Sequence, residues 1–276
     1  MALTHYACQH CGSWILWFDH EQPQNCPTCM DVRNALPDQG FSYLSWQDTD
    51  QFTTPYRELM PGLWEFWTEP QLGLGSHGWL LQTDQGNIAF EAAPFYSHEA
   101  LQQIFALGGI QTLAASHPHG YGALWQLQQV FDPVLHIHKN DLQHTKAFQV
   151  NAPIDDVQVL DEHRTLHWLG GHYAGQTALY DAQRRVLFSG DALKVDFEQG
   201  EPTALSCHKG FHYQIPLTQD ELKHYHHVFS QYPFEHVCTP FEFGPGVSQA
   251  KALRLIEHLL STTSHTQPVS INELAA

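Results

Sequence analysis

Residues 116–122 read Ser-His-Pro-His-Gly-Tyr-Gly and stand between an apolar stretch and a helical pattern. Two histidines at positions i and i+2 of an extended segment face the same side, so both can bind one metal ion. A His-x-His pair alone is more often two surface histidines. Further along the chain, however, residues 170–172 read Gly-Gly-His, and residues 189–191 read Ser-Gly-Asp.

Short apolar runs bounded by Gly, Pro, Asn or Asp surround these motifs, and such runs predict strands. They lie at 63–67, 79–83, 88–93, 112–116, 134–137, 165–168, 177–180, 186–189 and 236–239. Helical patterns alternate with them, and this alternation predicts a mixed α/β class.

The helices have recognisable starts and apolar faces. Ser97 can cap a helix that places Leu101, Ile104 and Phe105 on one face. Residues 218–221 form a capping box. A last apolar stripe has Leu253, Ile256 and Leu260 at helical spacing.

The order and separation of the motifs resemble those of the metallo-β-lactamase superfamily, from about residue 63 to about residue 246. His117 and His119 match the first two positions of the family's H-x-H-x-D-H loop. His172 matches a later histidine, and Asp191 matches the bridging carboxylate. The resemblance implies an αβ/βα sandwich with the metal at one edge.

The chain departs from the family pattern at three metal ligands. Tyr121 and Gly122 replace the Asp and His of the loop, and Phe241 or Glu242 stands where the final His is expected. By this correspondence the first metal site is complete and the second has lost three ligands. We therefore expect one ion, zinc or iron, held by three histidines, with Asp191 binding it or holding its water.

Three histidines and an open position are typical of a catalytic zinc site, where the ion lowers the pKa of a bound water to about 7. The sequence thus predicts a metal-dependent hydrolase. The resemblance implies an ester-, thioester- or lactone-type carbonyl in a small-molecule substrate. Asp191 would orient the water as a base, and Tyr121 would donate a hydrogen bond to the oxyanion.

Lys194, His208 and His212 follow the Asp191 strand, in a region where the family often places substrate-facing loops. A solvated loop explains these residues equally well. Two other functions keep the same fold. One is a binding or sensor protein with a degenerate site. The other is a redox protein, because flavodiiron proteins share this fold and work with rubredoxin-like electron donors.

Two Cys-x-x-Cys pairs open the chain: Cys8 with Cys11, and Cys26 with Cys29, with 14 residues between the pairs. Each pair presents two thiolates from one tight turn, and together they complete a tetrahedral site for zinc or iron. The pattern resembles zinc ribbons and rubredoxin-like units. This unit has too little core to fold alone, so metal binding would supply folding energy.

The amino-acid composition disfavours some classes of binding partner. The 276 residues carry 12 Lys and Arg against 29 Asp and Glu, a net charge of −17, which disfavours nucleic acid and anionic membrane surfaces. No signal-peptide pattern or long apolar run is present, so we expect a cytoplasmic protein. The expected organisation is a metal knuckle at 1–35, a linker at 36–61, the metallo-β-lactamase-like domain at 62–265 and a tail at 266–276.

Overall fold

A computed structural model describes residues 2–34, 36–262 and 268–275. The chain divides into two compact units, Met1–Pro153 and Ile154–Ala276. Each unit contains a six-stranded sheet and two α-helices, which is the composition expected for half of an αβ/βα sandwich.

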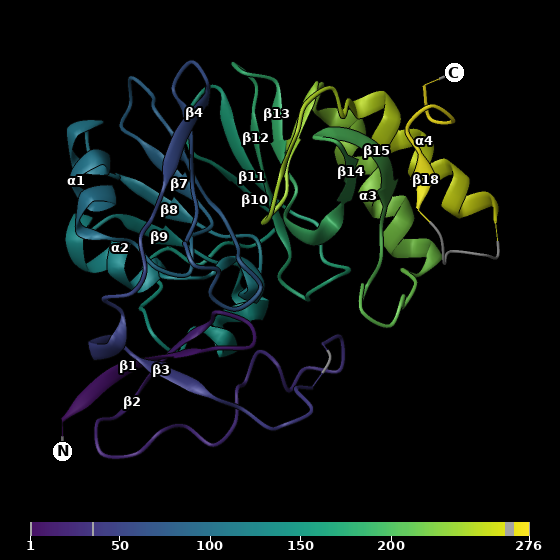
Figure 1. Ribbon diagram of the computed structural model, residues 1–276. Helices are drawn as coiled ribbons and strands as arrows, with labels where there is room; N and C mark the ends of the chain where they lie inside the picture. The colour runs from purple at the N-terminus through teal and green to yellow at the C-terminus, as the bar shows by residue number, and fades with distance from the viewer. Residues whose placement is uncertain (1, 35, 263–267, 276) are drawn as a thin grey trace. The chain divides into compact units, whose positions relative to one another are not determined.

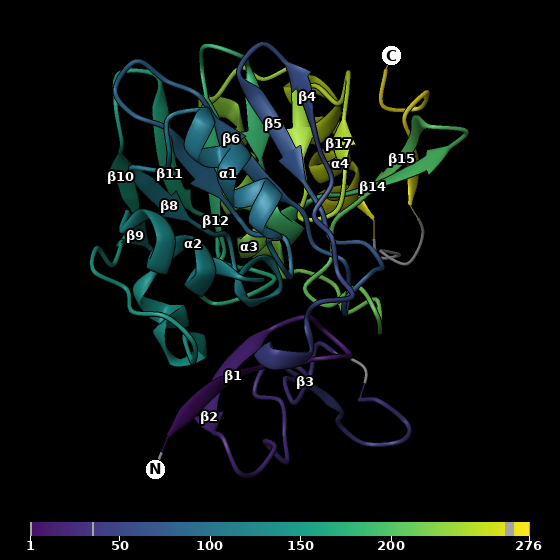
Figure 2. The same cartoon turned by 60° about the vertical axis from the view of Figure 1, so that its left-hand side comes forward.

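The main sheet of the first unit runs antiparallel through its first four strands and parallel through its last two pairings. In sheet order the strands are β4 (Tyr56–Met60), β5 (Leu63–Phe66), β6 (Gly78–Leu81), β7 (Ile88–Phe90), β8 (Thr112–Ala114) and β9 (Val134–His136). Helices α1 (His98–Ala106) and α2 (Leu124–Phe131) make the two parallel crossovers and cover one face of this sheet (Figure 2).

Helix α1 begins as predicted, because the Ser97 side chain accepts a hydrogen bond from the Ala100 amide. Its buried face was predicted incorrectly at one position: Phe105 is 76% exposed. Ile104 is buried as predicted, together with Ala100 one turn earlier. Phe105 lies 100° further round the helix than Ile104, which turns it toward solvent.

A smaller three-stranded sheet of the same unit lies near the N-terminus (Figure 1), and of the four paired cysteines it contains Cys8. Its strands are β2 (Trp14–Phe18), β1 (Leu3–Cys8) and β3 (Tyr43–Ser45), in that order. The region 36–61, predicted as a linker, therefore contributes β3 to this sheet and β4 to the main sheet. We call the part of the chain from β1 to β3 the cysteine knuckle.

The second unit is built on another six-stranded sheet. Its order is β10 (Val157–Val159), β11 (Arg164–Trp168), β12 (Thr177–Asp181), β13 (Val186–Phe188), β16 (His236–Cys238) and β17 (Phe243–Gly244). A small sheet of β14 (Lys194–Glu198), β15 (Glu201–Ser206) and β18 (Val269–Ser270) accompanies it. Helices α3 (Gln219–Gln231) and α4 (Gln249–Ser261) belong to this unit (Figure 1).

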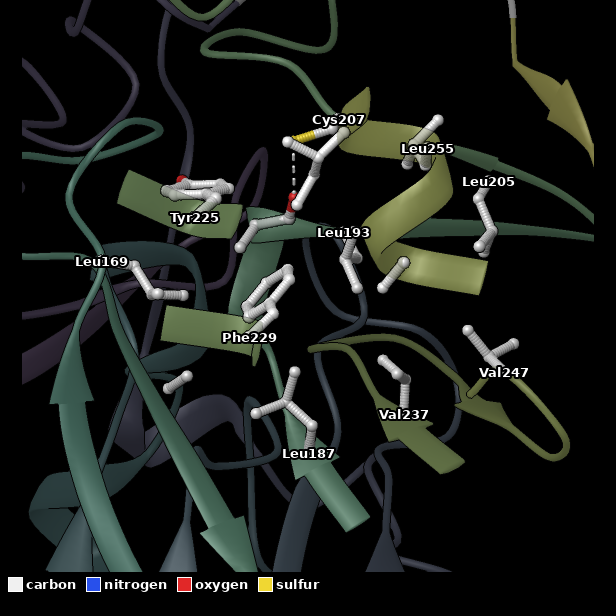
Figure 3. Packing of buried hydrophobic residues seen from close by; sticks show 14 of the residues in the cluster. Leu169, Leu187, Leu193, Leu205, Cys207, Tyr225, Phe229, Val237, Val247 and Leu255 are labelled. Carbon is white, nitrogen blue, oxygen red and sulfur yellow. Dashed lines mark hydrogen bonds between the residues drawn. The ribbon is translucent and has the colours of Figure 1, made fainter. Parts of the chain in front are cut away.

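The core of this unit joins the helices to the sheet. Phe229 of α3 lies near Leu187 of β13, and Tyr225 of α3 and Val237 of β16 belong to the same cluster (Figure 3). The predicted capping box of α3 is confirmed, with reciprocal bonds between Thr218 and Glu221.

The apolar stripe predicted for α4 is displaced around the helix. Ile256 is buried as expected, but Leu253 and Leu260 are only partly buried. Ala252, Leu255 and Leu259 complete the buried face. The buried face of α4 is rotated by about one residue from the predicted face. The spacing of the leucines alone could not distinguish these two faces.

All nine strands predicted from the sequence are present, each within two or three residues of its expected bounds. The predicted tail at 266–276 lies partly outside the described residues, and the described part contains β18. Within the described ranges, no helix has the length and apolar character needed to cross a membrane.

Candidate metal centres

The four cysteines of the knuckle converge as their spacing predicts. Cys8, Cys11, Cys26 and Cys29 are buried, are not in disulfides, and have sulfur atoms within 4.8 Å of one another. The Cys8–Cys29 sulfurs are 3.8 Å apart and the Cys11–Cys26 sulfurs 3.6 Å apart. A tetrahedron with metal–sulfur bonds of about 2.3 Å has edges of about 3.8 Å, so the four sulfurs fit one zinc or iron ion.

Tight turns of the backbone present these sulfurs. The Gly12 amide donates to the Cys8 carbonyl at 2.8 Å, and the Met30 amide donates to the Cys26 carbonyl at 3.0 Å. Gly12 has φ +83°, a value that side chains disfavour. Both cysteine pairs therefore owe their geometry to residues within a few positions of them.

The thiols perturb one another. Hydrogen bonds from the neighbouring thiols, led by Cys11, hold the pKa of Cys8 well below its usual range. The hydrogen bond between Cys11 and Cys26 raises the pKa of Cys11, and burial of Cys11 raises it further. The four groups therefore do not ionise together on their own, whereas a bound cation stabilises all four thiolates.

The first pair of candidate histidines follows β8 in the first unit. His117 and His119 are buried, and each offers a ligand atom within 4.8 Å of the other. The Ser116 hydroxyl donates to Glu91, and the Ser116 oxygen lies 2.7 Å from Nδ1 of His117. Since that hydroxyl proton is given to Glu91, Nδ1 of His117 must donate to Ser116, which leaves the Nε2 lone pair as the ligand.

Glu91 is part of the support for this loop. It is buried at the end of β7 and has φ 60°, a strained value for a non-glycine residue. A carboxylate that orients a metal-binding histidine through a second group is a common arrangement around metal sites. The role of Ser116 could not be predicted from the sequence motifs.

The other two candidate ligands lie in the second unit. The backbone carbonyl of Lys209 accepts a hydrogen bond from Nδ1 of His172 at 2.7 Å, so Nε2 of His172 carries the lone pair. Nε2 lies 3.4 Å from Oδ2 of Asp191. His172 is 2% and Asp191 8% exposed. A buried imidazole lone pair facing a carboxylate suits a cation, either a metal ion or a proton.

The remaining predicted residues fall into two groups. Tyr121 and His208 are buried, and their rings contact Phe148 and Phe211 respectively. Lys194 and His212 are exposed, and the Lys194 ammonium pairs with Asp196 at 2.5 Å. Among the substrate-loop residues, His208 alone is enclosed by the protein.

Cys207, next to His208, has a structural environment. Its thiol donates to the Ala192 carbonyl at 3.0 Å inside the core of the second unit (Figure 3). Burial raises the pKa of this thiol well above its usual range. A neutral thiol is a poor nucleophile, so Cys207 is unsuited to covalent catalysis.

No protein-family model matches the sequence. An uncharacterized protein of Bacillus subtilis, YmaE, is 23% identical over 286 residues, covering 96% of this chain and all of the relative. Similarity to solved structures is clearer. The metallo-β-lactamase FIM-1 of Pseudomonas aeruginosa, in a mono-zinc form, matches with a TM-score of 0.55 at 8% identity, covering 76% of this chain and 97% of that chain.

The flavodiiron protein of Giardia intestinalis also matches, with a TM-score of 0.51 at 17% identity. The match covers 75% of this chain and 59% of the flavodiiron chain. These similarities define the class: the protein has the metallo-β-lactamase fold, as the sequence motifs predicted, with an N-terminal group of four cysteines added to it.

Proposed function

We propose that the protein is a metal-dependent hydrolase that acts on an ester-, thioester- or lactone-type carbonyl of a small molecule. The resemblance implies one zinc or iron ion held by His117, His119 and His172. Asp191 would bind the same ion or its water. The fold supports the reaction class, and the substrate class rests on the resemblance.

The observation that carries the proposal is the arrangement of His172. Its Nδ1 donates to a backbone carbonyl, so its Nε2 lone pair faces the Asp191 carboxylate at 3.4 Å. His117 is oriented in the same sense by Ser116. Two histidines with anchored Nδ1 atoms are typical of metal ligands, whose second nitrogen is held by a hydrogen bond.

Each residue then has a defined task. The metal would polarise the carbonyl and supply a water of lowered pKa. Asp191 would orient that water and accept its proton, because its carboxylate lies beside the ligand nitrogen of His172. Tyr121, buried where the family has a second-site ligand, would donate a hydrogen bond to the developing oxyanion.

Metal analysis combined with turnover tests this proposal. The wild-type protein should contain two metal ions per chain, one at each donor set, and should hydrolyse members of an ester, thioester and lactone panel. His117→Ala should contain one ion and lose at least about 100-fold in turnover, since even supporting residues of metal sites contribute 10–100-fold. His98→Ala, a change at an exposed histidine with no assigned role, is the matched control. Equal metal content in wild type and His117→Ala would contradict the proposal.

A redox function is the second candidate, favoured by the structural match to a flavodiiron protein. The sulfur geometry of the knuckle fits iron as well as zinc. Iron bound by four thiolates absorbs visible light and zinc does not. A coloured protein with reversible bleaching on reduction would support the redox function. A colourless protein with zinc at the cysteines would support a structural knuckle. Tight metal binding without turnover on any substrate would support a binding or sensor protein.

A further inference from the structure

We propose that the cysteine knuckle positions the histidine loop, residues 116–122, and that Trp14 is the positioning residue that links them. This inference rests on the proposed function, because it assigns the knuckle a task at the histidine site. All the contacts involved lie within the first unit. They form three steps: two join the knuckle to neighbouring backbone, and one joins residues 91–94 to the loop that carries His117 and His119.

The first step is a hydrogen bond from the knuckle to the segment after β7. The indole Nε1 of Trp14 donates to the Pro94 carbonyl at 2.6 Å. Trp14 is buried, and its ring packs edge-on against Trp46 and Trp125. A short hydrogen bond from a packed, rigid ring holds the Pro94 carbonyl at one position.

The second step is a direct backbone contact beside the cysteine ligands. A Cβ atom at Gly73 would lie 2.0 Å from the Gly12 amide nitrogen and 2.3 Å from the Cys11 carbonyl carbon. The turn that carries Cys11 is thus packed against the 72–73 turn with no room for a side chain. A metal bound by Cys8 and Cys11 would hold that turn in place, and this fit with it.

The third step joins residues 91–94 to the histidine loop. The Ala92 amide donates to the Gly120 carbonyl at 2.9 Å, and the Ala123 amide donates to the Ala93 carbonyl at 2.9 Å. A Cβ atom at Gly122 would lie 2.2 Å from the Ala92 carbonyl oxygen. The two segments are therefore in backbone contact at the C-terminal end of the loop, from Gly120 to Ala123.

These steps make the knuckle part of the support for the histidines. A ligand loop held in its binding conformation has less conformational entropy to lose when a metal binds. If the Trp14 bond is removed, residues 91–94 gain freedom and the loop gains it with them. The expected result is weaker metal binding at His117 and His119, although neither residue is touched.

The test compares Trp14→Phe with Trp17→Phe, a change on the same strand at a residue 36% exposed. Trp14→Phe retains an aromatic ring and removes the N–H donor. Hydrogen exchange at the Ala92 and Ala123 amides should be about tenfold faster in Trp14→Phe. Cobalt affinity at the histidine site, titrated after the cysteines are filled with zinc, should fall about tenfold. Trp17→Phe should change neither value, and both variants should keep the zinc at the cysteines.

Unchanged exchange at Ala92 and Ala123 in a folded Trp14→Phe protein would overturn this inference. If the variant does not fold, the same amides are followed in the wild-type protein before and after chelation of the knuckle metal. Protection that persists after chelation would equally overturn it. The exchange measurement does not depend on metal at the histidines, so it separates this inference from the proposed hydrolase: absence of cobalt binding with faster exchange would contradict only the hydrolase.

Discussion

The four cysteines and the four candidate ligands His117, His119, His172 and Asp191 differ in how the chain supplies them. The cysteines lie within 22 residues, in one unit, on turns with their own hydrogen bonds. The histidines and Asp191 span 75 residues, with His117 and His119 in the first unit and His172 and Asp191 in the second. One set depends on local backbone geometry, and the other depends on strands that end at the correct places in the fold.

This difference predicts different consequences of losing a ligand. In a local set the metal holds together a segment that has little core of its own. In a dispersed set the sheets and helices exist without the metal, and supporting hydrogen bonds tune its affinity. The expected effects, from the largest to the smallest, are unfolding of the knuckle, weaker metal binding at the histidines, and a change in acid stability.

The largest effect is expected from Cys26→Ser. Metal binding by small cysteine-ligated units supplies roughly 10–16 kcal/mol of folding free energy, so losing one thiolate should release the metal and unfold the knuckle. Metal analysis should show one ion fewer per chain, and proteolysis should cleave before residue 43. Cys207→Ala, which changes a buried cysteine outside the set, should retain the ion. A Cys26→Ser protein that keeps its full metal content would break the comparison.

An intermediate effect is expected from Ser116→Ala. This change removes the link between Glu91 and Nδ1 of His117 and leaves every proposed ligand in place. Loss of a group that orients a metal ligand lowers metal affinity by about 10–100-fold. Competition with a chelator measures this affinity, and Ser206→Ala, at a buried serine of β15, is the control. Equal affinities in the two variants would show that Ser116 does not orient His117.

The smallest effect concerns pH. Burial lowers the pKa of His136 below its usual value of about 6.5, and a hydrogen bond with Ala152 opposes only part of that shift. In the unfolded chain, His136 takes up a proton as the pH falls below about 6.5. In the folded chain, His136 stays neutral until the pH reaches its lower folded pKa. The contribution to stability is therefore complete above pH 6.5 and is lost as the pH falls.

Urea unfolding at pH 7.5 and pH 5.5 measures this loss. His136→Gln cannot take up the proton, so its stability should fall less between the two pH values than that of the wild type. His98→Gln, at an exposed histidine of the same unit, should behave like the wild type. If His136→Gln shows the same fall as the wild type, exclusion of a proton at His136 does not contribute to acid stability.

Much of the fold could be predicted because its signals are local. The helix start at Ser97, the capping box at Thr218 and all nine predicted strands depend on residues close together in the sequence. Nine strands of the described residues were not predicted. Six of them lie in the two small sheets, whose strands do not show a clear alternation of apolar and polar residues: β1, β2, β3, β14, β15 and β18. The other three, β4, β10 and β17, are edge strands of the main sheets. The buried face of α4 was predicted incorrectly because the side chains that become buried depend on which elements pack against the helix.

The sequence by itself determined the set of four cysteines, the α/β class and the positions of the histidine motifs, because spacing of two or three residues and short apolar runs express these features directly. Only the tertiary structure decided which groups orient the ligands. Glu91 and Ser116 are 25 residues apart, Lys209 and His172 are 37 apart, and Trp14 and Pro94 are 80 apart. Each of these bonds uses a backbone carbonyl or a common side chain. Nothing in the sequence marks such a group as a hydrogen-bond partner until the fold brings the two residues together.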